Sequence, residues 1–229
     1  MPAALAKRKD QAKTLVGIVG YTPVLEVFPL GPRLMAGLED ALLGQDFVVE
    51  NMTWGPIHIV QRFQEPHAER FERVVLVGAA SNAPTPGAVQ AYRWRGGSLP
   101  EVELQERVYE GITGVVDIEN TLVIGDYFGV WPEETFSVEA DLPGDAFGRM
   151  VIAESEGWAD NAALTSHLGF SPDHMRDALI VNCTAIARDG DRANVPLIDK
   201  SAEMSAPIVP FIRNHTILRG SRQAIGEGK

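Results

Sequence analysis

The sequence predicts an α/β protein, a three-layer sandwich in which a mostly parallel sheet carries helices on both faces. Continuous apolar runs such as residues 15–19 and 74–77 are typical of strands that are buried on both faces. Segments in which apolar residues recur at helical spacing, such as Leu34, Leu38 and Leu42, alternate with these runs. Strands are expected at 14–20, 47–51, 73–80, 88–94 and 135–140.

The helices are predicted from their starting residues as well as from their periodicity. Pro32 follows Gly31 and suits the first turn of a helix, and Ser171 with Pro172 supplies a cap and a first helical residue. Helices are expected at 32–42, 57–63, 115–127 and 172–187. Residues 88–94 alternate in polarity, which indicates a strand with one wet face near a sheet edge, whereas 95–112 show no clear pattern.

These elements predict one domain with additions. Residues 1–13 are expected to be a flexible lead, and 14–189 the α/β domain. Residues 144–168 separate the last strand from the last helix and are interpreted as an insertion. Residues 190–229 are interpreted as a C-terminal tail that either folds back on the domain or binds a partner.

Composition excludes several classes of function. The chain has 229 residues, of which 45% are hydrophobic, and a formal net charge of -11, so it is an ordinary but acidic globular protein. An acidic surface repels phosphate backbones, which argues against nucleic-acid and anionic-membrane binding. Residues 15–19 are too short an apolar run for a signal-peptide core, and a cytoplasmic location is expected.

Familiar catalytic and metal-binding motifs are missing from the sequence. The lone cysteine, Cys183, excludes an internal disulfide and lies in an apolar run, where a buried small hydrophobic residue is the favoured interpretation. The histidines form no zinc-type pair on a helix face. There is no complete dinucleotide fingerprint, no phosphate-binding loop and no Gly-x-Ser-x-Gly motif.

Acidic residues near strand ends are the remaining candidates for a site. Glu26 stands alone in an apolar loop, and a buried carboxylate there would need a partner, a proton or a metal ion. The alternative is that Glu26 caps a helix or faces solvent. The turn after the second strand supplies a carboxylate, a hydroxyl and an aromatic ring: Glu50, Thr53, Trp54 and Gly55. Asp117 and Glu119 lie near a helix start, where acids commonly interact with the helix dipole, so a structural role is favoured for them.

Several short motifs occur in a fixed order along the chain. They are Gly17-Ile18-Val19-Gly20 leading to Glu26, Gly31-Pro32-Arg33, the turn 50–55, Pro86-Gly87-Ala88-Val89, the segment 127–134, and Gly169-Phe170-Ser171-Pro172. Taken in order, they resemble the hydrogenase maturation endopeptidases, which trim a C-terminal extension from the large subunit of nickel–iron hydrogenases. The resemblance covers about residues 14–189 without the insertion, and it implies the same α/β fold and a metalloenzyme large subunit as the partner.

The resemblance also implies which residues meet the substrate. Glu26 matches an acid that contacts nickel in the family, where the nickel belongs to the substrate protein and no intrinsic cofactor is implied. Gly78 stands where the family has a nickel-binding Asp, and Thr113 or Gly114 where it has a nickel-binding His. No catalytic residue is assigned. The residues implied to bind substrate or partner are Glu50, Thr53, Trp54, Gly55, Gly78, Thr113, Gly114 and Asp117.

Three hypotheses follow. The chain is a divergent maturation endopeptidase, or it is a catalytically inactive descendant (a pseudoenzyme) that serves as an assembly chaperone or complex subunit. The third hypothesis is an unrelated small-molecule hydrolase of similar architecture, because a fold alone does not fix a function.

Overall fold

The computed structural model of the chain describes residues 13–44, 46–80, 87–112, 117–157 and 161–204. Within these residues the centre is a 6-stranded sheet with the strand order β2-β1-β3-β5-β4-β6. The strands are β1 Thr14–Ile18, β2 Phe47–Asn51, β3 Arg73–Ala80, β4 Val89–Trp94, β5 Glu134–Asp141 and β6 Leu197–Lys200. Strands β2, β1, β3 and β5 are parallel, whereas β4 runs antiparallel to β5 and β6 runs parallel to β4. The predicted mostly parallel sheet is therefore confirmed.

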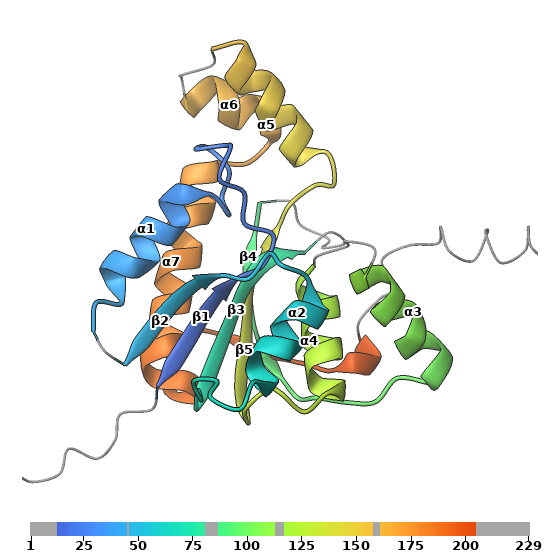
Figure 1. The fold of residues 1–229 in the computed structure, drawn as a ribbon. Coiled ribbons are helices and arrows are strands. Elements are labelled where there is room, and N and C mark those ends of the chain that lie inside the picture. Colours follow the sequence, from blue (N-terminus) through green and yellow to red (C-terminus); the bar gives the residue numbers. More distant parts are fainter. Residues whose placement is uncertain (1–12, 45, 81–86, 113–116, 158–160, 205–229) are drawn as a thin grey trace, which may run out of the picture.

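Helices cover both faces of the sheet, as the sequence predicts (Figure 1). One face is covered by α1 Pro32–Ala41 and α7 Pro172–Asp189, and the other by α2 Pro56–Gln64 and α4 Ile118–Tyr127, with α3 Glu101–Ile112 packed beside them. The predicted cap of α7 is present, because the Ser171 hydroxyl oxygen accepts a hydrogen bond from the His174 backbone N–H at 3.3 Å.

Three segments have structures that the sequence left open. Residues 95–112, which show no clear pattern, contain α3, where Glu101 and Glu103 lie in the first turn. The insertion forms a pair of packed helices, α5 Ala146–Ser155 and α6 Asn161–Leu168, which stands away from the sheet (Figure 1). The segment interpreted as a tail supplies β6, so that β4 lies one strand inside the edge. Four residues are too few for a periodicity to show, and β6 is held by pairing with β4.

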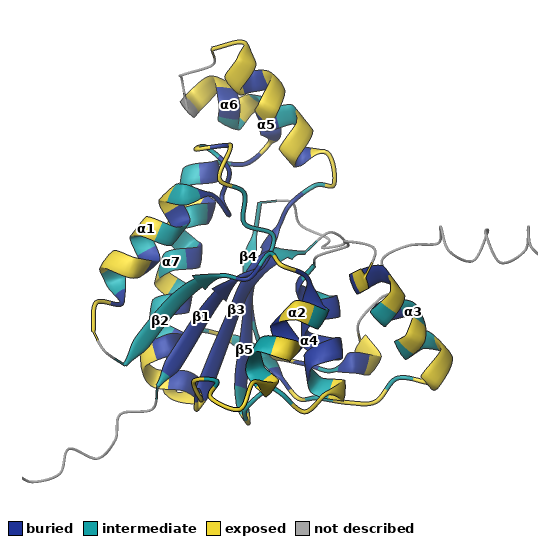
Figure 2. Cartoon of the chain, in the orientation of Figure 1, coloured by how far each residue is buried: buried dark blue, intermediate teal, exposed yellow. Residues whose placement is uncertain are grey.

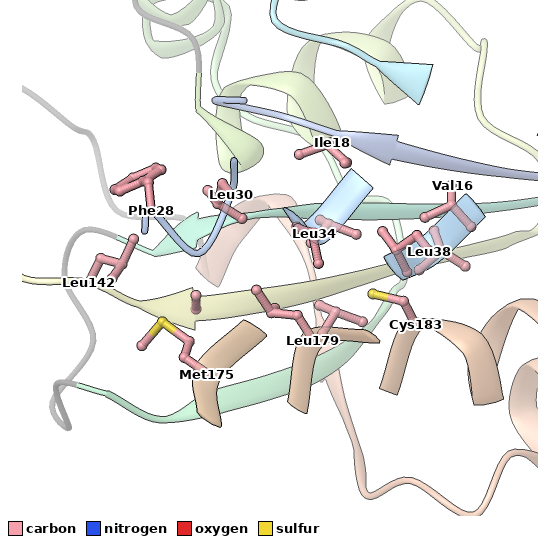
Figure 3. Close-up of a cluster of buried hydrophobic side chains, with 14 of the residues drawn as sticks. Val16, Ile18, Phe28, Leu30, Leu34, Leu38, Leu142, Met175, Leu179 and Cys183 are labelled. Carbon is pink, nitrogen blue, oxygen red and sulfur yellow. The ribbon is translucent and has the colours of Figure 1, made fainter. Parts of the chain in front are cut away.

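The main hydrophobic core lies between the sheet and the α1–α7 layer. Figure 3 shows Leu34 and Leu38 of α1 directed toward Leu179 and Cys183 of α7, beneath Val16 of β1. Cys183 is fully buried, which confirms its interpretation as a buried small residue. A second core cluster lies under α2 and α4, and Figure 2 shows β1, β3 and β5 as mostly buried, whereas β2 is of intermediate burial.

Among the described residues, the helices are too short or too polar to cross a lipid bilayer. Residues 1–12 of the predicted lead, residues 81–86 and residues 205–229 of the predicted tail lie outside the described residues.

Candidate functional site

The carboxyl ends of β1 and β2 bring two predicted segments together. The Thr53 hydroxyl donates to the Tyr21 carbonyl oxygen at 3.5 Å, and this contact joins the turn after β2 to the loop after β1. The Thr53 backbone N–H is held by the Asn51 side-chain oxygen at 3.0 Å. We call residues 19–31 and 52–55 the edge loops. They lie beyond the carboxyl ends of β1 and β2, which is where parallel α/β folds bind ligands.

Glu26 lies on an edge loop but is not the buried carboxylate that its apolar neighbours suggest. Its side chain is 58% exposed and lies 3.7 Å from the Arg33 guanidinium, which is itself 53% exposed. The structure matches the solvent-facing alternative, because the chain turns Leu25 and Phe28 into the core, which directs Glu26 toward solvent. Such an exposed ion pair contributes little to stability.

Glu50 and Trp54 are linked through one arginine on α2. The Arg62 guanidinium donates to Glu50 Oε1 at 2.5 Å and lies 5.8 Å from the centroid of the Trp54 ring. Trp54 is 47% exposed, and its carbonyl oxygen lies 2.7 Å from His58 Nδ1. A half-exposed tryptophan held by a cation and a backbone contact is a preorganised apolar surface.

Gly55 allows the edge loop to enter α2. Its φ of +93° lies in the region that favours glycine, and Pro56 follows as the first residue of the helix. The glycine therefore has a structural reason that needs no ligand.

Gly78 lies on β3, and its lack of a side chain allows α4 to pack closely against the sheet. A Cβ atom built on Gly78 would lie 3.0 Å from Ile118 Cβ and 3.1 Å from Ile118 Cδ1. The position is fully buried beneath the first residue of α4, so a longer side chain there would displace the helix.

Asp117 caps α4 and is partly buried. Its Oδ1 accepts from the Asn120 backbone N–H at 2.8 Å, whereas its Oδ2 has no hydrogen-bond partner among the described residues. Burial raises the pKa of Asp117 to about 6, against the opposing hydrogen bond from Asn120. The Asn120 side chain in turn contacts Arg107 at 2.8 Å and Glu110 at 3.0 Å, which fixes α4 against α3.

The edge loops and α4 do not assemble the ligand set implied by the resemblance. Glu26 is exposed and paired, and Gly78 offers no side chain and no room for one. Thr113 and Gly114 lie outside the described residues. Across the ranges the structure describes, no group of three or more His, Cys, Asp or Glu side chains is arranged to hold a metal ion.

A second group of polar residues lies under α4, and Glu119 alone among them is a candidate in the sequence. Lys200 of β6 places its Nζ atom 2.8 Å and 2.9 Å from the two carboxylate oxygens of Glu139 on β5, and 3.1 Å from Glu119 Oε1 on α4. The Ser137 hydroxyl donates to Glu139 Oε1 at 2.6 Å. We call these residues, together with Tyr92 and Asp141, the buried ion cluster.

Electrostatics in the buried ion cluster are dominated by burial and by excess acid. Burial lowers the pKa of Lys200, but the charges of Glu139 and Glu119 together raise it by more, so the net shift is upward. The pKa of Tyr92 is raised by burial and by Glu139, and Lys200 opposes this from 4.8 Å above the tyrosine ring. Burial and Glu139 also raise the pKa of Asp141. Lys200 is therefore a charged ammonium group and not a free amine nucleophile at neutral pH.

One signal in the sequence points to this cluster. Residues 134–141 alternate between apolar and polar, and Ser137, Glu139 and Asp141 share the face that α4 covers. Two acids on a strand inside a sheet need a buried partner. That partner, Lys200, comes from the segment interpreted as a tail, so its position depends on the tertiary fold.

Comparison with protein-family models, with curated proteins and with solved structures gives no significant match to this chain.

Proposed function

We propose that this chain is a protein-binding relative of the hydrogenase maturation endopeptidases. We also propose that it has no site that recognises nickel in the partner and does not cleave the partner through such a site. The proposed partner is the large subunit of a hydrogenase or a related metalloenzyme, and the proposed role is that of an assembly chaperone or complex subunit. The edge loops are the proposed contact surface.

The observation that carries the proposal is the packing of Gly78 against Ile118. Gly78 occupies the position that carries a carboxylate ligand in the family, and here α4 packs against β3 at this position. A Cβ atom built on Gly78 would lie 3.0 Å from Ile118 Cβ. Glu26 supports the same conclusion, because its carboxylate is turned to solvent and paired with Arg33. A lone exposed carboxylate is a poor nickel site, since nickel favours imidazole ligands.

The surface of the edge loops supports binding. Val24 is 74% exposed and Trp54 is 47% exposed, and the Thr53–Tyr21 contact joins their loops. Exposed aromatic residues that are already held in place are enriched at protein interfaces, because they lose little freedom on binding. The formal net charge of -11 favours a partner with a basic surface.

The test is co-purification from the native host with the chain as bait, using wild type, Trp54→Ala and Val24→Ser. We expect a partner in stable stoichiometry with wild type, and at least about tenfold weaker capture by Trp54→Ala, since an aromatic hot spot contributes about 2 kcal/mol or more. Ile198→Ser is the matched control, because Ile198 is also 47% exposed but lies on β6 at the opposite side of the sheet.

Intact-mass analysis of the partner separates binding from processing. A captured partner of unchanged mass, with capture dependent on Trp54, supports the proposal. A partner whose C-terminus is shortened only in the presence of the chain would make the chain an endopeptidase and overturn the non-cleaving role. Equal capture by Trp54→Ala and Ile198→Ser would exclude the edge loops as the contact surface.

A further inference from the structure

We propose that Asp141, at the edge of the buried ion cluster, is a binding site for a guanidinium group, supplied by an arginine side chain of the partner protein. Asp141 is the last residue of β5, at the carboxyl end of the sheet. The inference deepens the proposed function and rests on it for the source of the arginine.

The first observation is that Asp141 is buried without a hydrogen-bond donor. It is 2% exposed, and neither Oδ1 nor Oδ2 has a hydrogen-bond partner among the described residues. Its backbone is fully engaged, since its N–H donates to the Ala88 carbonyl oxygen at 2.9 Å and its own carbonyl accepts from Gly87 at 2.8 Å. Buried polar side chains are nearly always paired, so a carboxylate with two open oxygens can accept hydrogen bonds from an incoming donor.

The second observation is that Asp141 faces the buried ion cluster. It shares a face of β5 with Glu139, two residues earlier, and the pKa values of Asp141 and Tyr92 both respond to Glu139 and Lys200. The cluster holds the carboxylates of Glu119, Glu139 and Asp141 against the single ammonium of Lys200. The excess of acid favours a second cation and repels an anion.

The free atoms select a guanidinium over a metal ion. Both oxygens of Glu139 are already bonded to Lys200, and Ser137 donates to one of them, so only Asp141 has a carboxylate with both oxygens open. A metal ion would find one carboxylate ligand there, which is too few. A guanidinium needs only two parallel acceptor oxygens, and its planar fork matches a single carboxylate.

Several residues around the cluster are less buried than Asp141. Gln90 and Tyr92 of β4 are only partly buried, and the Tyr92 hydroxyl donates to Gln90 Oε1 at 2.5 Å. Beyond Asp141 the chain turns outward, and Gly144 and Asp145 are exposed.

The experiment titrates the full chain with N-acetylarginine amide and follows the Asp141 side-chain carboxyl carbon by ¹³C NMR. The Asp141 signal is assigned by its loss in Asp141→Asn, which keeps the shape of the side chain. We expect a saturable shift of this signal and a lower pKa of Asp141 in the presence of the probe. N-acetyllysine amide should bind at least threefold more weakly, and N-acetylglutamine amide should produce no shift.

Calorimetry with variants gives the second readout. Asp141→Asn should weaken binding of the arginine probe at least tenfold, whereas Asp145→Asn, which removes an exposed carboxylate nearby, should leave it unchanged. No saturable shift in the wild-type chain, or equal losses in the two variants, would overturn the proposal. The probe is a small molecule, so a negative titration would overturn the guanidinium site without contradicting the proposed protein-binding function. A negative co-purification would contradict the protein-binding function without contradicting the guanidinium site.

Discussion

Lys200 and Glu139 form a buried ion pair in which the ammonium nitrogen lies 2.8 Å and 2.9 Å from the two carboxylate oxygens. The side chains are only 8% and 2% exposed. The pair connects β6 to β5 across β4, so it fixes the short edge strand that follows α7.

Lys200→Met should lower the free energy of unfolding by about 3–5 kcal/mol, because it leaves the Glu139 carboxylate buried without its partner. Urea unfolding at pH 7 measures the change. Arg95→Met is the control, since Arg95 pairs with Asp199 at the surface, 2.8 Å away, and its loss should barely change stability. A loss in Lys200→Met as small as that in Arg95→Met would contradict a desolvated pair.

Asp117→Asn should stabilise the protein at pH 7. The folded pKa of Asp117 is raised from 3.8 to about 6, so the folded state holds the proton more tightly than the unfolded state. Stability due to this group is therefore present below about pH 4 and is lost as the pH rises through about 6. The gain in Asp117→Asn is up to about 3 kcal/mol at pH 7.

Urea unfolding between pH 4 and pH 8 checks this dependence, and Asn at position 117 keeps the capping oxygen of α4. The control is Asp145→Asn, because Asp145 precedes α5 without a side-chain cap hydrogen bond. Identical pH profiles for wild type and Asp117→Asn would show that Asp117 is not desolvated.

Gly78→Ala should destabilise the fold by about 1–3 kcal/mol, the usual cost of overpacking a core. The added methyl group would meet Ile118 Cβ at 3.0 Å, and the start of α4 would have to move. Gly144→Ala is the control, because a Cβ at Gly144 meets nothing within 4 Å. Thermal unfolding of the two variants gives the comparison, and equal midpoints would show that α4 accommodates a side chain at position 78.

Cys183 should resist alkylation in the native protein. Its side chain is fully buried on α7, and burial raises the pKa of the thiol, so little thiolate is available and the reagent has no access. Labelling by iodoacetamide, followed by intact mass, should be complete in denaturant and should follow the unfolding transition as urea increases. Rapid labelling without denaturant would contradict the packing of α7 on the sheet.

The sequence alone was sufficient for strands β1 to β5 and for the helices with strong patterns. Residues 47–51 and 73–80 coincide with β2 and β3, because apolar, β-branched runs of this length favour strands. β3 is mostly buried, whereas β2, at the edge of the sheet, is of intermediate burial. Pro32 and the Ser171–Pro172 pair mark the starts of α1 and α7, since capping is a local interaction. The burial of Cys183 also followed from its immediate neighbours.

Other features depended on contacts between distant parts of the chain. The sequence left open whether Glu26 is buried or faces solvent, and side chains on either side of it turn into the core and leave it at the surface. Glu119, Glu139 and Lys200 are separated along the chain, and only the pairing of β6 with β4 brings the lysine under α4.

The sequence thus determined which segments are buried and where the helices begin, because burial and capping act through local composition. The tertiary structure decided which charges meet. A carboxylate looks the same in the sequence whether its partner is water, Arg33 or Lys200, and only the fold sets the distance between them.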